Sequence, residues 1–213
     1  MKIISIQTGK PKTISVNGRD VVTSIFKYPI DKPVKVNFLG IESDTQSDLK
    51  VHGGKFKAVY AYPSEHYPYW KELLAQYDFE WGAFGENLVT TGLLEQEIFL
   101  GDTLKMGNVL LRVTQPRFPC YKLGVKFNDG QMIAHFHRSG RSGFYFEVLE
   151  EGSFQKGDSI QVVEKRNGTS ISKFVKAKTE SNPNPDTIKS ILDDPNLIDE
   201  WRSYFSRKLV KLS

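Results

Sequence analysis

The sequence predicts a mainly β domain, built as a closed or nearly closed barrel, followed by a small region of three helices. Between residues 2 and 165, short apolar runs alternate with turn residues. Asn17-Gly18 separates two alternating runs, and this dipeptide favours a tight hairpin because both turn positions need positive φ. After Arg166 the pattern changes to helical periodicity. We therefore expect an α+β chain with a barrel over 1–166 and a helical tail over 167–213.

The expected strands are short and follow one another closely. Gly101-Asp102 and Gly107-Asn108 mark turns among them. In chain order the strands are KIISIQ, TISV, VVTSI, VKVNFLG, AVYAYP, ENLVTTG, IFLGD, TLKMG, VLLRVTQP, GFYFEVLE and SIQVVEK.

Helices are expected at two places inside the barrel and at three in the tail. One helix should follow Tyr62 with Ser64 as its N-cap, since apolar residues recur at helical spacing from Tyr67 to Tyr77. A second helix or an irregular turn is expected over 126–136. In the tail, prolines separate the helical runs NGTSISKFVKAK, ESNPNPDTIKSILDD and PNLIDEWRSYFSRKLVKL. A tail of this length is near the limit for independent folding, so it should pack on the barrel or on another subunit.

Composition is that of an ordinary globular protein. The 213 residues are 39% hydrophobic and 25% charged, and the net charge of +4 comes from 29 basic and 25 acidic residues spread along the chain. Such interleaving disfavours nucleic-acid binding, which gathers basic residues on one face. The N-terminus does not resemble a signal peptide and no run is long enough to span a membrane. A cytoplasmic protein without an intramolecular disulfide is expected, because the chain has one cysteine.

That cysteine, Cys120, lies in QPRFPCYKLG, residues 115–124. The two prolines of this stretch fix φ and remove backbone donors, so the segment should leave its strand as a stiff loop. Arg117 and Lys122 favour the thiolate, the form that attacks electrophiles and binds soft metals. The alternative is that Cys120 is a small buried apolar residue.

A glycine-rich turn in VHGGKFKAV, residues 51–59, is the second candidate site. Gly53-Gly54 allows close approach of the backbone to a ligand, and His52 with the neighbouring lysines could contact an anion such as a phosphate. The alternative is a plain turn between strands with solvated lysines. The chain shows no His, Cys or carboxylate spacing typical of a zinc site.

The third candidate is WGAFGENLVTTGL, residues 81–93. Its glycines again indicate tight backbone, while Glu86 and Asn87 supply a carboxylate and an amide suited to the hydrogen-bonding edge of a heterocycle. The alternative is that Asn87 caps a turn ahead of an apolar strand.

The order of these stretches carries a resemblance that none of them has alone. VHGG, AVYAYPSEHYPYW, GAFGENLVTTGL, GD, QPRFPCYKL and SGFYFEVLEEGSFQKGD together resemble the MOSC domain family, named for the C-terminal domain of molybdenum cofactor sulfurase. The similarity is greatest to its YiiM-like bacterial subgroup, which carries a short three-helix tail, and it covers nearly the whole chain.

The resemblance implies a β-barrel that binds the molybdenum cofactor, a molybdopterin, with Cys120 as thiolate ligand of the metal. It implies that Arg117 contacts the cofactor phosphate or holds the thiolate, and that His52, Gly53 and Asn87 line the pocket. It also implies reduction of N-hydroxylated compounds, including base analogues such as 6-hydroxylaminopurine, to amines. Since no flavin, haem or nicotinamide motif is recognisable, electrons would come from a partner reductase.

Other interpretations stay open at the level of sequence. The chain could be a carrier that holds the cofactor, or a persulfide on Cys120, without turning over substrate. It could be a nucleic-acid-binding barrel, which would show salt-dependent binding. The apolar stripe of the last helix, which includes Trp201 and Phe205, is compatible with a homodimer.

Overall fold

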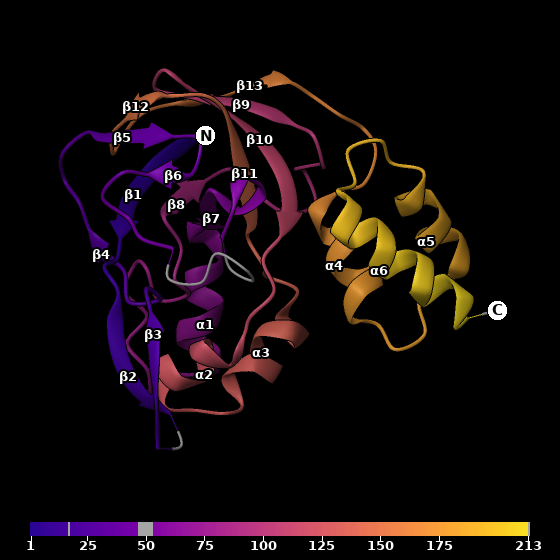
Figure 1. Cartoon of the computed structure of the whole chain (residues 1–213), viewed down its shortest axis with the longest axis horizontal. Helices are drawn as coiled ribbons and strands as arrows, with labels where there is room; N and C mark the ends of the chain where they lie inside the picture. The colour runs from indigo at the N-terminus through magenta and orange to yellow at the C-terminus, as the bar shows by residue number, and fades with distance from the viewer. Residues whose placement is uncertain (17, 47–52, 213) are drawn as a thin grey trace.

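The computed structural model describes residues 1–16, 18–46 and 53–212. A mixed eight-stranded sheet forms the centre of the molecule, and the tail helices lie together beside it (Figure 1). Its strands are antiparallel except for the parallel pair β7 and β8. In spatial order they are β13 (Ile160–Glu164), β9 (Thr103–Met106), β10 (Val109–Pro116), β11 (Phe144–Glu150), β7 (Val59–Pro63), β8 (Leu88–Thr91), β1 (Lys2–Thr8) and β4 (Tyr28–Pro29).

Two smaller β elements flank this sheet. Strands β12 (Gly152–Phe154), β5 (Val34–Asn37) and β6 (Gly40–Ile41) form a three-stranded sheet. Strands β2 (Lys12–Val16) and β3 (Arg19–Thr23) form a hairpin in which Val16 pairs with Arg19. The hairpin therefore has the expected two-residue connection, and its Gly18 has φ +74°. Asn17 lies outside the described residues.

The α+β expectation is confirmed. Of the two forms expected for the barrel, closed or nearly closed, the closed form is wrong. The sheet ends at β13 on one side and at β4 on the other. An isolated bridge between Lys2 and Ser159 links β1 to the residue before β13, without a continuous ladder. Strand β4 has two residues and one of them is Pro29, which has no N–H to donate to a further strand.

Three helices cover one end of the sheet: α1 (Tyr67–Leu73), α2 (Tyr121–Phe127) and α3 (Met132–Ser139). The expected N-cap at Ser64 is wrong, because residues Ser64–His66 form the 3₁₀ turn η2 and the Ser64 hydroxyl donates to Glu65. The expected helix also ends earlier, at Leu73. A further 3₁₀ turn, η1, spans Lys55–Lys57. The region 126–136, where a helix or an irregular turn was expected, contains the end of α2, a turn and the start of α3.

The tail forms the three predicted helices, α4 (Ile171–Thr179), α5 (Pro185–Leu192) and α6 (Asp199–Val210). Ser170 caps α4 by accepting a bond from the Lys173 N–H, and Asn184 caps α5 in the same way. The tail packs on the sheet, since its buried apolar residues share one core cluster with those of β9 and β10. The boundary at 166 stays a prediction. No helix in the described ranges is both long and apolar enough to cross a bilayer.

Candidate functional site

One hollow collects most of the predicted site residues. It has a volume of about 110 Å³, room for a small polar group or several water molecules. Segments from the β3 end, the 44–46 loop, β7, the 84–87 turn and the loop after β10 line it. The described lining residues are Thr23, Ser24, Ile25, Lys27, Asp44, Thr45, Gln46, Lys57, Tyr60, Phe84, Gly85, Asn87, Arg117, Phe118, Cys120, Lys122 and Tyr145.

Cys120 lines this hollow from the start of α2. It occupies the N-cap position with φ −112° and ψ 172°, and its carbonyl accepts a bond from the Leu123 N–H at 2.9 Å. The residue is half-buried. The predicted exit from the strand is confirmed, because β10 ends at Pro116 and the chain enters a helix directly after Cys120.

Arg117 is buried and incompletely bonded. Its Nη2 donates to the Phe84 carbonyl at 3.2 Å, and its guanidinium carbon lies 4.8 Å from the ring centre of Phe136 and 5.6 Å from that of Tyr60. Its Nη1 has no hydrogen-bond partner among the described residues, and 6% of the residue is exposed; the phenol of Tyr145 lies close enough to interact with the guanidinium. A buried cationic donor without an acceptor raises the free energy of the folded protein. An acceptor from outside the chain would therefore stabilise the protein.

Cations outnumber carboxylates around the hollow. Among its described lining residues, Lys27, Lys57, Arg117 and Lys122 carry positive charge and Asp44 carries the negative charge. Such an excess in a confined site favours anionic ligands.

The buried pair Lys27 and Asp44 forms one wall. Lys27 Nζ lies 2.5 Å from Asp44 Oδ1, and both side chains are less than a tenth exposed. Burial lowers the pKa of Lys27, and the neighbouring Asp44 carboxylate opposes that change. Lys27, next to the hollow, thus holds its proton less firmly than a lysine in water.

Lys126, on α2, joins that helix to two other parts of the site. Its Nζ donates to the carbonyls of Gly82 at 2.6 Å and Ile25 at 3.3 Å. Burial lowers the pKa of Lys126 from 10.5 to about 8, and the Glu86 charge works against this. Helix α2, which begins directly after Cys120, is therefore held against the segments that contain Gly82 and Ile25.

Two tyrosines, Tyr60 and Tyr145, form a further wall, with ring centres 5.1 Å apart. The Tyr60 hydroxyl donates to the Ser142 carbonyl at 2.9 Å. Burial raises the pKa of both phenols, and the charge of Arg117 opposes this in each. Both therefore remain neutral at physiological pH.

Asn87 lines the hollow as predicted, but the protein already uses its amide. Its Oδ1 accepts from the Tyr60 N–H at 3.1 Å, and its Nδ2 donates to Asp44 at 2.8 Å and to the Gln7 carbonyl at 3.3 Å. Both Nδ2 hydrogens are thereby occupied. Asn87 positions Asp44, so the structure supports neither its use for a heterocycle edge nor a simple turn cap.

Glu86 is fully buried, and hydrogen-bond donors of the protein itself occupy its carboxylate, so it is not available to a ligand. Its carboxylate accepts bonds from the Tyr67 hydroxyl and from the N–H groups of Gly82 at 2.6 Å and Phe84 at 3.0 Å. These bonds fix the turn whose Gly85, with φ +81°, lines the hollow. A side chain at Gly85 would be strained and would press on Ile25.

Of the stretch 51–54, which was predicted to form a glycine turn, the structure describes Gly53 and Gly54. His52 lies outside the described residues. Gly53 is described but is not among the residues that line the hollow. The neighbouring Gly54, with φ +90°, donates its N–H to the lining residue Gln46 at 3.0 Å. Gly54 is thus joined to the site through Gln46.

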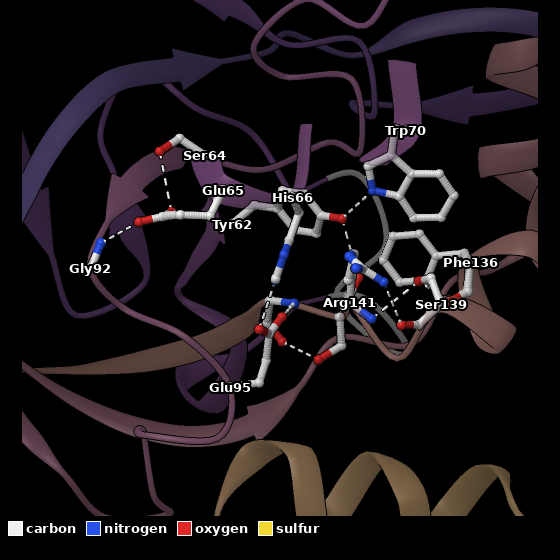
Figure 2. Close-up of polar contacts among 12 residues, drawn as sticks. Tyr62, Ser64, Glu65, His66, Trp70, Gly92, Glu95, Phe136, Ser139 and Arg141 are labelled. Atoms are coloured by element: carbon white, nitrogen blue, oxygen red, sulfur yellow. Dashed lines mark hydrogen bonds and ion pairs between the residues drawn. The ribbon is translucent and has the colours of Figure 1, made fainter. Parts of the chain in front are cut away.

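Sequence reasoning did not find a buried network behind the site (Figure 2). His66 Nε2 lies 2.7 Å from Glu95 Oε2, and Glu95 Oε1 accepts from the Gly143 N–H at 2.8 Å. The Gly143 carbonyl in turn accepts from the Arg117 N–H at 3.3 Å. Beside it, Trp70 Nε1 donates to the Tyr62 hydroxyl at 2.6 Å. No local motif signals this network, because its members are far apart in sequence.

Comparison with known proteins places the chain in a family. The model of the MOSC domain matches residues 48–161, the part that supplies Asn87, Arg117, Cys120 and both tyrosines. The chain therefore belongs to the MOSC-domain family, as its motifs predicted.

Individual relatives show which proteins this chain is similar to over most of its length. The Bacillus subtilis (strain 168) protein YflK is 36% identical over 211 residues, which are 99% of this chain and 95% of the relative. The crystal structure of YiiM from Geobacillus stearothermophilus has 37% identity and a TM-score of 0.81, covering 98% of each chain. A Gibberella moniliformis (strain M3125 / FGSC 7600) protein named "Reductase" is 35% identical over 166 residues, which are 76% of this chain but 29% of that protein.

Proposed function

We propose that the protein binds the molybdenum cofactor at this hollow and reduces N-hydroxylated compounds to amines. The observation that carries the proposal is the joint presence of Cys120, an excess of cationic side chains and the unsatisfied Arg117 Nη1 on one hollow. A neutral apolar ligand would leave Arg117 Nη1 without an acceptor, whereas an anionic metal cofactor would meet both this donor and the thiol.

The residues present fit such a group. Cys120 Sγ would be the protein ligand, since a thiolate suits a metal that the pterin dithiolene already holds through sulfur. Arg117 and Lys122 would pair with the anionic groups of the cofactor. The cofactor is larger than the hollow and would extend beyond it. When bound, it would supply two-electron transfer to the N–O bond of the substrate.

The protein side of the reaction would be positioning and proton supply. Conversion of R–NH–OH to R–NH₂ and water breaks the N–O bond and consumes two electrons and two protons. Lys27 Nζ lines the hollow with a lowered pKa and is suited to give up one of these protons, while Asp44 holds the ammonium in place. The tyrosine wall would exclude bulk water from one side of the substrate.

The electrons would come from a partner reductase in the cytoplasm. The sequence has neither a Gly-x-Gly-x-x-Gly nor a Cys-x-x-Cys-His motif. The relative named "Reductase" supports a reductive activity, because it is 35% identical to this chain over 166 residues.

Reduction of 6-hydroxylaminopurine tests the proposal. The protein, produced in a host that makes the cofactor, is supplied with a chemical reductant, and adenine formation is followed. We expect turnover by the wild type and none by Cys120→Ser. Cofactor binding without adenine formation, or with formation equal in both proteins, would contradict the proposal, and binding alone would favour a cofactor carrier.

A further inference from the structure

We infer that the C-terminal helical tail is part of the site, because Trp201 on α6 holds the loop that carries Arg117 and Cys120. Trp201 contacts Phe118 and Gln115, which lie beside Arg117 and Cys120 in the chain, and we therefore assign it a positioning role. The inference takes Cys120 as the reactive group, as the proposed function does, but it concerns a different part of the chain.

The first contact is with the loop itself. The ring centre of Trp201 lies 5.3 Å from that of Phe118, which stands between Arg117 and Cys120 and lines the hollow. Trp201 Nε1 also donates to Gln115 Oε1 at 2.8 Å. A single tail residue thus contacts the end of β10 and the loop that follows it, on either side of Pro116.

Helix α4 also packs against Phe118. The ring centre of Phe174 lies 6.3 Å from that of Phe118 and 5.1 Å from that of Trp201. Lys178 Nζ stands 5.2 Å from the Phe118 ring centre. Phe118 therefore packs against both of these tail helices and against His137 of α3, whose ring centre lies 6.2 Å away, while Arg117 and Cys120 line the hollow.

A second connection reaches the same loop through the buried network of Figure 2. The Ser172 N–H at the start of α4 donates to the Glu95 carbonyl at 2.9 Å. The Glu95 carboxylate holds the Gly143 N–H, and the Gly143 carbonyl holds the Arg117 N–H. The Arg117 backbone is thus linked through Gly143 to Glu95, the residue that the start of α4 also contacts.

A third connection links α6 to another lining residue. Lys57 Nζ lies 3.8 Å from a Glu200 carboxylate oxygen, next to Trp201. This pair is partly exposed and contributes little energy by itself. The pair gives the start of α6 a further contact with a residue that lines the hollow.

Cys120 alkylation by iodoacetamide tests the inference without any metal. The rate is measured on cofactor-free protein, well below the unfolding temperature, for wild type, Trp201→Leu, Trp201→Phe and Phe205→Leu. Phe205 is the matched control, because it lies on the same helix, is fully buried and packs 5.0 Å from the same Phe174 ring. Among the described residues its ring contacts are Phe174, Trp201 and Tyr204.

We expect Trp201→Leu to raise the alkylation rate about tenfold, because loosening the loop increases the fraction of molecules with an accessible thiol. Trp201→Phe keeps a ring against Phe118 and should give a smaller rise. Phe205→Leu should stay within about twofold of wild type, although it destabilises the tail core.

Two results would overturn the inference: an unchanged rate in Trp201→Leu, or an equal rise in Phe205→Leu, which would show general destabilisation. If Trp201→Leu does not fold, the comparison of Trp201→Phe with Phe205→Leu decides in the same way. The thiol reaction does not depend on molybdenum, so failure here and failure of the proposed function are separate outcomes.

Discussion

Replacement of Lys126 should change how the stability of the protein depends on pH. Lys126 Nζ is held by the carbonyls of Gly82 and Ile25, away from bulk water. Burial lowers its pKa from 10.5 to about 8, whereas in the unfolded chain the ordinary value returns. Between these two values the unfolded chain binds more protons than the folded protein, so stability rises with pH.

The size of the effect follows from the two pKa values. Below pH 8 the buried ammonium lowers the free energy of unfolding by about 3 kcal/mol, at 1.36 kcal/mol per unit. This cost is relieved as pH rises from 8 towards 10.5. Between pH 7.5 and 9.5 the wild type should gain about 2 kcal/mol relative to Lys126→Met.

Urea unfolding of both proteins at pH 7.5 and pH 9.5 measures this gain. The loss of two hydrogen bonds in the variant adds a pH-independent offset, so the tested quantity is the change of the difference with pH. Lys105→Met, at an exposed position on β9, controls for loss of a positive charge. A difference that stays constant, or falls as pH rises, would refute the reasoning.

Two further substitutions test the walls of the site. Glu86→Gln replaces an acceptor of three buried bonds by a group with one accepting oxygen, and should lower the free energy of unfolding by about 2–4 kcal/mol in urea titration; a loss below about 0.5 kcal/mol would contradict this assignment. Lys27→Met removes the proposed proton source, so turnover of 6-hydroxylaminopurine should fall about 100-fold while molybdenum content is retained; full turnover would exclude Lys27 as the proton donor.

Local patterns predicted the parts of the fold that depend on neighbouring residues. The tail helices were predictable because their caps, prolines and apolar stripe lie within each helix, as at Ser170 and Asn184. Sheet closure was not predictable, because it depends on whether two distant edges meet. Strand spacing alone did not show that Pro29 would end the sheet at β4.

In the site, too, features set by neighbouring residues were predictable and features set by distant residues were not. Arg117 and Cys120 are three positions apart on a stiff loop, so their common placement followed from the sequence. Asn87 was found through its motif, but its bonds to Gln7 and Asp44 come from segments far along the chain. Single-sequence patterns carry no information on such partners.

Pairs that are separated along the chain were missed for the same reason. Lys27 and Asp44 are 17 positions apart, and His66 and Glu95 are 29 apart. Trp201 and Gln115 are separated by 86 positions, so no pattern in the loop indicated that the tail holds it. A buried charge or aromatic residue without a local partner is the signal that could direct a search for them.

Molybdenum content of the wild type and of Cys120→Ser, both produced in a host that makes the cofactor, tests the central claim most directly. Sulfur and oxygen differ little in volume, so the variant should keep its fold, as circular dichroism and the unfolding temperature would show. We predict about one molybdenum per wild-type chain and almost none in the variant, because a hydroxyl is a poor substitute for a soft thiolate ligand. Equal molybdenum in the two proteins, or none in the wild type, would contradict the claim that Cys120 holds a molybdenum cofactor.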